Sequence, residues 1–324
     1  MLFEAHGPTD KLRKVQLDTH PLCALFGQEI VPGSGDGASV VIVRYHNNST
    51  QEIVASTDDT ALQIPLEPDT TSLQKIEVDL HGSPASAYRM GKTYDAWFSE
   101  CFGVPMTLVY LGDGRRAVLG KNLLPRPAQE EQRGWLNHLT SYLAGSLPQG
   151  SGGDLASKKW LSFTDVAPLM VASESSLQDV RVRLLNGLPV EMYKFRPNIV
   201  VDGKGEEPWA EDFWAEIQIG SGIGIGIGDA SRKSTLQLTG NCVRCISVNV
   251  DYRTGKPADG EEGHVLKRLM KDRRVDLGSK WSPVFGRYAF LHSRHAGGVS
   301  ISVGDAVEVT RRDAERSVWD WPGL

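Results

Sequence analysis

Alternating apolar and polar residues recur in short runs along the first 125 residues and predict strands there. The runs cover residues 40–45, 61–65, 74–80 and 106–111. The segment 93–102 has a different period, because its aromatic residues recur at three- and four-residue intervals and Gly103 follows the last of them. This spacing predicts a short amphipathic helix that ends at Gly103.

The second half of the chain combines one capped helix with many strand-like runs. Ser175 and Gln178 have the S-x-x-Q spacing of a capping box, and the apolar residues after them keep helical intervals until Asn186-Gly187. Another helix is expected at 130–143. Strands are predicted at 198–201, 215–219, 236–238, 245–250, 284–291 and 300–309.

Many short strands with few helices favour an α+β, β-rich fold with a β-barrel or a strongly curved sheet. The segment 146–154 (SLPQGSGGD) is rich in Gly, Ser and Pro and is the best linker candidate. We therefore expect an N-terminal domain at 1–145, a second domain at 146–312 and a C-terminal tail at 313–324.

Composition narrows the function classes. The chain has 324 residues, of which 40% are hydrophobic. Its net charge of -5 argues against a nucleic-acid binder, which typically carries a basic surface. Four cysteines do not form a disulfide framework in so long a chain, and no secretory segment opens it, so we expect an intracellular protein. No run reaches the roughly 20 apolar residues of a spanning helix.

Two tempting motifs do not meet the requirements of their chemistry. The glycine-rich segment 220–229 (GSGIGIGIGD) lacks G-x-G-x-x-G spacing and a following Lys-Ser/Thr, so a hairpin extension is expected rather than a phosphate loop. The eight histidines form no Ser/His/Asp order and no H-E-x-x-H motif. The sequence therefore offers no hydrolase machinery.

The segment Cys242-Val243-Arg244-Cys245 is the strongest candidate for chemistry. A zinc site would need two more ligands nearby, and a thioredoxin-like dithiol would need a helix start, whereas Cys245 leads into an alternating segment. Two interpretations remain open: a pair of structural cysteines, or one cysteine that binds a metal or cofactor. In a regular strand Arg244 and Cys245 face opposite sides, so a bend is needed for both to reach one ligand.

The segment FRPNIVV supplies a second candidate. Pro197 is expected to keep Arg196 extended, which would place Arg196 and Asn198 on the same side of the chain, where they could bind a phosphate or a heterocycle edge. The competing interpretation is that Arg196 pairs with Glu211 or Asp212. Elsewhere, Asp165 reads first as a cap or turn residue, and Tyr288 as either packed or a hydroxyl donor.

These pieces, in this order, resemble the MOSC family, the domain found at the C-terminus of molybdenum cofactor sulfurases. The resemblance covers roughly 160–309, and it is strongest to the mitochondrial amidoxime-reducing component branch. It rests on DVAPLMVASESSLQDV, FRPNIVV, PWAEDFWAEIQIG, CVRCISVNVDYRTG, LMKDRR, SPVFGRYAFL and VSISVGDAVEV. More weakly, residues 16–124 resemble part of the family's N-terminal β-barrel domain.

The resemblance implies a function and a set of site residues. It implies a molybdenum–molybdopterin cofactor with Cys245 as metal ligand and catalytic residue, in an enzyme that reduces N-hydroxylated small molecules. A b-type cytochrome and its NADH-dependent reductase would supply the electrons, in the cytoplasm or at mitochondria. The implied cofactor contacts are Arg244, Arg196, Asn198, Val243, Tyr288 and Asp165.

The chain departs from the family pattern at its start and at one cofactor segment. Residues 1–20 supply none of the Y-P-[IV]-K-S and D-R-x-W motifs, so we expect an N-terminal barrel that lacks its first strand. Val166-Ala167 stands where the family has hydroxyl residues. Two alternatives to an enzyme therefore stay open: a non-catalytic module that binds the cofactor or carries sulfur on Cys245, and a structural remnant.

Overall fold

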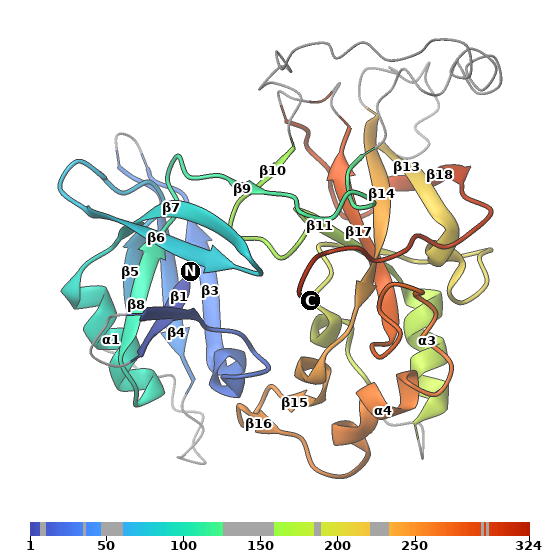
Figure 1. The fold of residues 1–324 in the computed structure, drawn as a ribbon, viewed down its shortest axis with the longest axis horizontal. Coiled ribbons are helices and arrows are strands. Elements are labelled where there is room, and N and C mark those ends of the chain that lie inside the picture. The colour runs from blue at the N-terminus through green and yellow to red at the C-terminus, as the bar shows by residue number, and fades with distance from the viewer. Residues whose placement is uncertain are drawn as a thin grey trace, which may run out of the picture.

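The computed structural model describes residues 1–6, 11–34, 37–46, 61–125, 159–184, 189–220, 233–292, 295 and 298–324. Two groups of strands lie side by side, one from the N-terminal region (residues 1–125) and one from the C-terminal region (residues 159–324) (Figure 1). The expected helix at 130–143, the linker at 146–154, the domain boundary at 145 and all but the first residue of 220–229 fall outside the described residues.

The N-terminal region contains two antiparallel sheets. Their strand orders are β2-β1-β8-β7-β6 and β3-β4-β5. Every strand predicted in this region forms, and the predicted helix forms as α1, whose C-cap Gly103 adopts the left-handed conformation (φ 70°). The elements are β1 Leu2–His6, β2 Lys11–Lys14, β3 Phe26–Val31, β4 Val40–Tyr45, β5 Ala61–Pro65, β6 Gln74–Leu80, β7 Ser83–Arg89, α1 Lys92–Phe102, β8 Met106–Tyr110 and β9 Arg116–Ala117.

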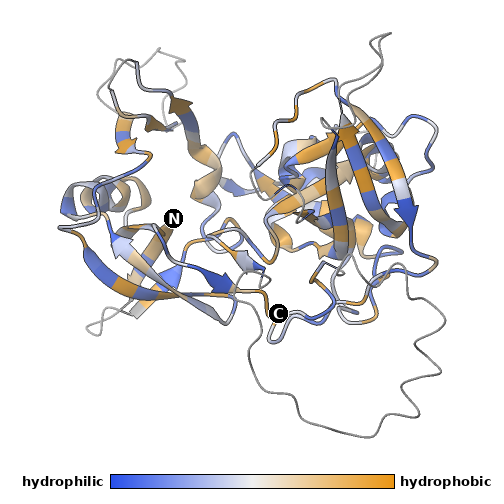
Figure 2. Cartoon of the chain, turned by 90° about the horizontal axis from the view of Figure 1, so that it is seen from above, coloured by the Kyte–Doolittle hydropathy of each residue, from blue (hydrophilic) through white to orange (hydrophobic). Residues whose placement is uncertain are grey.

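The C-terminal region is built on a six-stranded sheet of order β12-β11-β17-β14-β13-β18. Its pairs are antiparallel except β11 with β12, and hydrophobic and hydrophilic residues alternate along its strands (Figure 2). The elements are β10 Trp160–Leu161, β11 Leu169–Ser173, α3 Glu174–Arg183, β12 Ile199–Val201, β13 Trp214–Gly220, β14 Ser234–Val243, β15 Val250–Asp251, β16 Lys256–Pro257, α4 Val265–Leu269, β17 Val284–Leu291 and β18 Ala306–Arg312.

Strand β17 lies in the middle of this sheet, between β11 and β14, and all but its last residue are buried. Gly286 is required there, because its φ is +79° and an added Cβ would lie 2.5 Å from the Met170 side chain and 2.8 Å from the Val171 carbonyl oxygen. The close approach of β17 to β11 brings the turn at 165–168 next to Tyr288.

Three local predictions were wrong. Helix α3 begins at Glu174, and Ser175 donates its hydroxyl to the Gly203 carbonyl (3.0 Å) instead of capping the helix. Residues 245–250 do not form a strand, because β14 ends at Val243 and the 3-10 helix η8 (Ile246–Asn249) follows. The last strand begins at Ala306, six residues later than predicted.

A tight hairpin joins β6 to β7 through His81 and Gly82. Both residues have positive φ (59° and 76°), which defines a type I′ turn. Strand β7 was missed because its sequence, SPASAYR, is rich in small residues and contains a proline. The turn matters for the site because it projects His81 toward the C-terminal region.

Described segments of both regions meet at the end of the chain. Trp319 and Trp321 are buried in the same apolar cluster as Leu177 and Phe285, and the Trp321 indole donates to the His81 carbonyl (2.8 Å). The predicted α+β, β-rich fold is confirmed. None of the helices within the described residues is long and apolar enough to cross a membrane.

Candidate functional site

A cavity of about 560 Å³ lies between the two regions and is lined by residues from both. Six of the seven predicted site residues line it, although they come from four separate segments of the chain. Asn198 lines an adjoining cavity of about 200 Å³, to which Arg196 and Tyr288 also contribute. The six are Asp165, Arg196, Val243, Arg244, Cys245 and Tyr288.

Cys245 occupies the bend between β14 and η8. Its side chain is exposed, and its Sγ donates a hydrogen bond to the Ser247 hydroxyl (3.2 Å). The Arg244 backbone amide donates to the Pro283 carbonyl (2.8 Å), which fixes the chain immediately before the bend. The alternation at 245–250 was misread as a strand, but the bend supplies the geometry that lets neighbouring residues reach one cavity.

Arg244 and Cys242 form a buried pair in the wall of the adjoining cavity. The Arg244 guanidinium lies 2.9 Å from the Cys242 sulfur and donates to the Phe195 carbonyl (2.9 Å). Cys242 is therefore a buried cysteine packed beside a cation. Of the two cysteines in the motif, Cys245 is the one whose sulfur is exposed.

Arg196 does not have the predicted extended conformation. It adopts the left-handed region (φ 54°, ψ 42°) at the end of the 3-10 helix η5 (Met192–Phe195), so it and Asn198 are not related by a strand repeat. The Arg196 side chain is exposed, lines both cavities and makes no hydrogen bond or ion pair among the described residues. Asn198 is engaged with the backbone, because its Oδ1 accepts from the Met170 amide (2.8 Å).

The competing partners suggested for Arg196 are occupied elsewhere. Asp212 pairs with Arg273 and Arg316 (each 2.8 Å), and Glu211 accepts from the Ser176 hydroxyl (2.7 Å). Within the described part of the chain, the interpretation that Arg196 pairs with either acid is therefore wrong.

A hydrogen-bonded chain that the sequence did not reveal crosses the cavity wall. Lys14 Nζ lies 2.6 Å from His81 Nδ1, His81 Nε2 lies 2.8 Å from Asp165 Oδ1, and the Tyr288 hydroxyl donates to Asp165 Oδ2 (2.8 Å). Since an ammonium can only donate, His81 Nδ1 accepts and Nε2 carries the hydrogen that faces Asp165. All four residues come from segments more than 60 residues apart.

The charges around Asp165 set its pKa. Burial by itself would raise the pKa of Asp165, but hydrogen bonds from His81 and Tyr288, together with the positive charge of Arg196, lower it from 3.8 to about 2. Burial chiefly raises the pKa of Tyr288 and lowers that of Lys14. Asp165 is therefore ionised, while Tyr288 keeps its proton. The expectation that Asp165 is only a turn residue misses this contact.

One buried arginine holds both ends of this arrangement. Arg116, 1% exposed, donates to the carbonyls of Leu80 (2.8 Å) and Ser83 (3.2 Å), which flank the His81 turn. It also donates to the carbonyls of Thr164 (2.8 Å), Asp165 (3.3 Å) and Ser162 (3.0 Å). Arg116 therefore ties the His81 turn to the Asp165 loop.

Three buried polar atoms on residues that line the cavity have no hydrogen-bond partner among the described residues. They are Thr164 Oγ1, Arg244 Nε and Tyr252 Oη. Because buried polar atoms are nearly always paired, these three atoms are groups that a polar ligand or ordered water in the cavity would satisfy. Thr164 also offers a hydroxyl two residues before Val166-Ala167. Among the described residues, no group of three or more His, Cys, Asp or Glu side chains could hold a metal ion.

Comparison with known proteins identifies the domain family that the C-terminal region matches. The MOSC domain family model matches residues 158–308, which include β10 to β17 and the Cys245 bend. The chain therefore contains a MOSC domain, as its motifs predicted.

Similar proteins fall into two groups. Over 152 residues the chain is 35% identical to mitochondrial amidoxime-reducing component 1 of Mus musculus, covering 46% of this chain and 38% of the mouse protein. It is 27% identical over 209 residues to a molybdenum cofactor sulfurase of Oryza sativa subsp. japonica (62% and 20%), and 25% identical over 257 residues to one of Emericella nidulans (74% and 28%). The chain thus spans well under half the length of these curated relatives.

Proposed function

We propose that the chain binds a pterin-linked molybdenum cofactor and is an oxidoreductase that reduces N-hydroxylated small molecules. The observation that carries the proposal is the exposed Cys245 thiol at a bend in a cavity that also holds Arg196 and three unsatisfied polar atoms. A thiolate is a soft metal ligand, and a metal-bound thiol is deprotonated. The similarity to proteins named for amidoxime reduction supports the reaction class.

The residues of the cavity suit the parts of such a cofactor. Cys245 would be the single protein ligand of the metal, and the cofactor would supply other ligands. Arg196, with its exposed guanidinium, would bind the phosphate. Thr164 Oγ1, Arg244 Nε and Tyr252 Oη would bind the pterin edge, with Val243 and Asn198 at its border.

The proposed reaction breaks an N–O bond. Two electrons and two protons are consumed, an N–H bond forms, and the oxygen leaves as water. The cofactor would supply the two-electron exchange. Lys14 Nζ and His81 Nε2 hold protons on the cavity wall, and Asp165 orients His81 and the protonated Tyr288 hydroxyl.

The electrons must come from outside the chain. We propose a b-type cytochrome and its NADH-dependent reductase as donors, in the cytoplasm or at mitochondria, where the names of the amidoxime-reducing relatives place those proteins. We also propose the domain division at residue 145, since the MOSC match begins at 158.

The decisive experiment measures metal content. The chain is produced in a host that makes molybdenum cofactor, and molybdenum per polypeptide is measured for the parent, Cys245→Ser and a control, Cys101→Ser, whose thiol lies on α1 away from the cavity. We expect near-stoichiometric metal in the parent and the control, and a loss of at least about tenfold in Cys245→Ser. Equal metal in all three proteins would refute the ligand assignment.

A second function is favoured by the same exposed thiol. Cys245 could carry sulfur as a persulfide in a module without its own turnover, and several similar proteins are named molybdenum cofactor sulfurases. Intact-mass measurement of the purified protein separates the two. A 32 Da adduct that is absent from Cys245→Ser, without bound molybdenum, would favour the sulfur carrier.

A further inference from the structure

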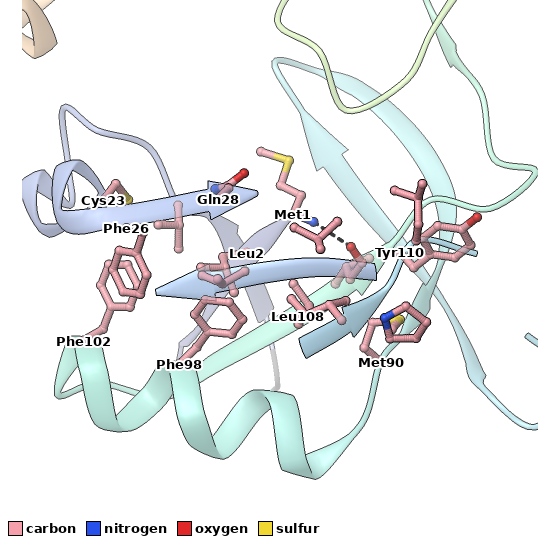
Figure 3. A pocket seen from close by; sticks show the side chains of 17 residues that line it. Met1, Leu2, Cys23, Phe26, Gln28, Met90, Phe98, Phe102, Leu108 and Tyr110 are labelled. Carbon is pink, nitrogen blue, oxygen red and sulfur yellow. Dashed lines mark hydrogen bonds between the residues drawn. The ribbon is translucent and has the colours of Figure 1, made fainter. Parts of the chain in front are cut away.

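A second cavity, of about 420 Å³, lies inside the N-terminal region between the β3-β4-β5 sheet and the elements β1, β8 and α1 (Figure 3). Its walls are almost entirely apolar. Val41 and Val43 of β4 and Ile64 of β5 line one side, and Phe98 and Phe102 of α1 line the other. Within the described residues, no Asp, Glu, Lys, Arg or His side chain lines this cavity.

The cavity is large for the interior of a small sheet domain. Protein interiors contain few voids larger than a water molecule, and unburied apolar surface forfeits about 25 cal/mol per Å². Ligand pockets, by contrast, typically measure roughly 300–1,000 Å³ and are lined by apolar side chains with a few polar groups. The amide of Gln28 and the thiol of Cys23 are such groups. The size and lining therefore fit a ligand site.

The apolar cavity adjoins the Cys245 cavity. Four residues line both: Met1, Val15, Cys23 and Gln28. On the Cys245 side of this junction the walls carry charged side chains, whereas among the described residues no Asp, Glu, Lys, Arg or His side chain lines the other side. The Met1 amino group there donates to the Val109 carbonyl (2.7 Å), and burial lowers its pKa to about 5, so it is neutral at pH 7. Burial raises the pKa of Cys23 to about 11, as expected at an apolar boundary. A single ligand with one polar end and one apolar end would complement both cavities.

We propose that the apolar cavity binds the hydrocarbon or aryl tail of an amphipathic substrate whose N-hydroxylated head lies beside Cys245. The inference rests on the proposed reductase function and narrows its substrate class. It assigns the N-terminal region a specificity role. The neutral walls select against charged tails, because a charge buried there would have no partner.

The test uses two matched ligand series. Straight-chain hydroxamic acids with 2 to 10 carbons carry the N–O bond, and the corresponding primary amides lack it. Kd values for both series are measured by calorimetry with the full chain purified from a cofactor-producing host. We expect Kd to fall by about fourfold for each added CH2 until the cavity is full. A Kd that does not depend on chain length would overturn the proposal.

Cavity-filling variants locate the tail. Ile64→Trp adds bulk inside the cavity, Leu66→Trp adds it at the exposed rim, and Ile30→Trp adds it on the same sheet at a residue that is 63% exposed and does not line the cavity. We expect the dependence on chain length to be lost in the first two variants and retained in the third. Retention in all three would place the tail elsewhere and contradict the proposal.

The two series also separate this proposal from the function on which it rests. If the amides bind more tightly with length but no hydroxamic acid is reduced, the tail site stands and the reductase proposal fails. If short hydroxamic acids are reduced while neither series depends on length, the reductase proposal stands and the tail site fails.

Discussion

The two walls of the Cys245 cavity differ in how the chain builds them. On the C-terminal wall, Arg196, Arg244 and Cys245 belong to short continuous motifs, and Arg244 is fixed by partners in its own region. On the N-terminal wall, Lys14 and His81 stand in segments without any motif. His81 reaches the site through a hairpin turn that Arg116 contacts, and Lys14, at the end of β2, reaches it through His81. Motifs therefore reveal ligand-facing residues, whereas the opposite wall depends on tertiary contacts that no motif encodes.

The largest loss of stability is expected at Arg116, which donates hydrogen bonds to the His81 turn and to the Asp165 loop. Arg116→Ala removes a buried cation that donates to carbonyls on both sides and leaves several of them without partners. Each unsatisfied buried group costs about 1–3 kcal/mol, so we expect the free energy of unfolding to fall by about 3 kcal/mol or more. Urea unfolding followed by tryptophan fluorescence measures this change.

The neighbouring arginine is the matched control. Arg115 is exposed, and its one polar or ring contact within the described part of the chain is with the Trp160 ring, at 4.8 Å, so Arg115→Ala should cost less than about 1 kcal/mol. Similar losses in the two variants would contradict the role of Arg116 as the tie between the walls.

The sequence predicted most of the fold because apolar periodicity is a local signal. Strands β4, β5, β6 and β17 have the bounds that alternation and branched residues indicated. Strand β7 could not be found in this way, because its small residues pack only after β6 folds back on it. The bend at Cys245 was missed because η8 has the same alternating residue types as a strand.

The residues of the candidate site could likewise be predicted only in part from the sequence. From residue chemistry alone, the cysteine motif and the FRPN motif could each be structural or functional. The family resemblance favoured the functional interpretation of both. The structure brings those residues together but gives Arg196 a left-handed backbone that Pro197 did not suggest. His81 carried one usable signal, its position before a glycine between two strand-like runs, which is typical of a tight hairpin. Nothing local marked Lys14 or Arg116.

A smaller change in stability is expected from the Asp165 carboxylate, which contacts His81 of the N-terminal wall and Tyr288 of the C-terminal wall. The pKa of Asp165 in the folded protein is about 2, below its ordinary value of 3.8, so the folded state binds fewer protons than the unfolded state. Its contribution to stability is therefore present above about pH 4 and is lost as the pH falls toward 2. The side chain is 50% exposed, so solvent screening limits the contribution to about 1 kcal/mol.

Comparison of the parent with Asp165→Asn tests this pH dependence. We expect the parent's advantage in free energy of unfolding to be constant between pH 5 and 7 and to shrink below pH 4. Urea unfolding at half-unit steps from pH 3 to pH 7 measures it. An advantage that persists unchanged at pH 3 would show that Asp165 is not held by His81 and Tyr288.

The smallest effect on stability, with the opposite sign, is expected at the ligand-facing Arg196. A non-glycine residue in the left-handed region costs roughly 1–2 kcal/mol, and glycine relieves this cost while losing about 0.5–1 kcal/mol of chain entropy. Because the Arg196 side chain makes no hydrogen bond or ion pair within the described residues, and its charge is the smallest of the effects on Asp165, Arg196→Gly should be as stable as the parent or more stable by up to about 1 kcal/mol. Arg196→Ala keeps the backbone cost and serves as the control, so urea unfolding should rank glycine above alanine. If both variants instead lose as much stability as Arg116→Ala does, then the Arg196 side chain supports the fold. The two walls would then not differ in the way that we describe, with one wall facing the ligand and the other held by tertiary contacts.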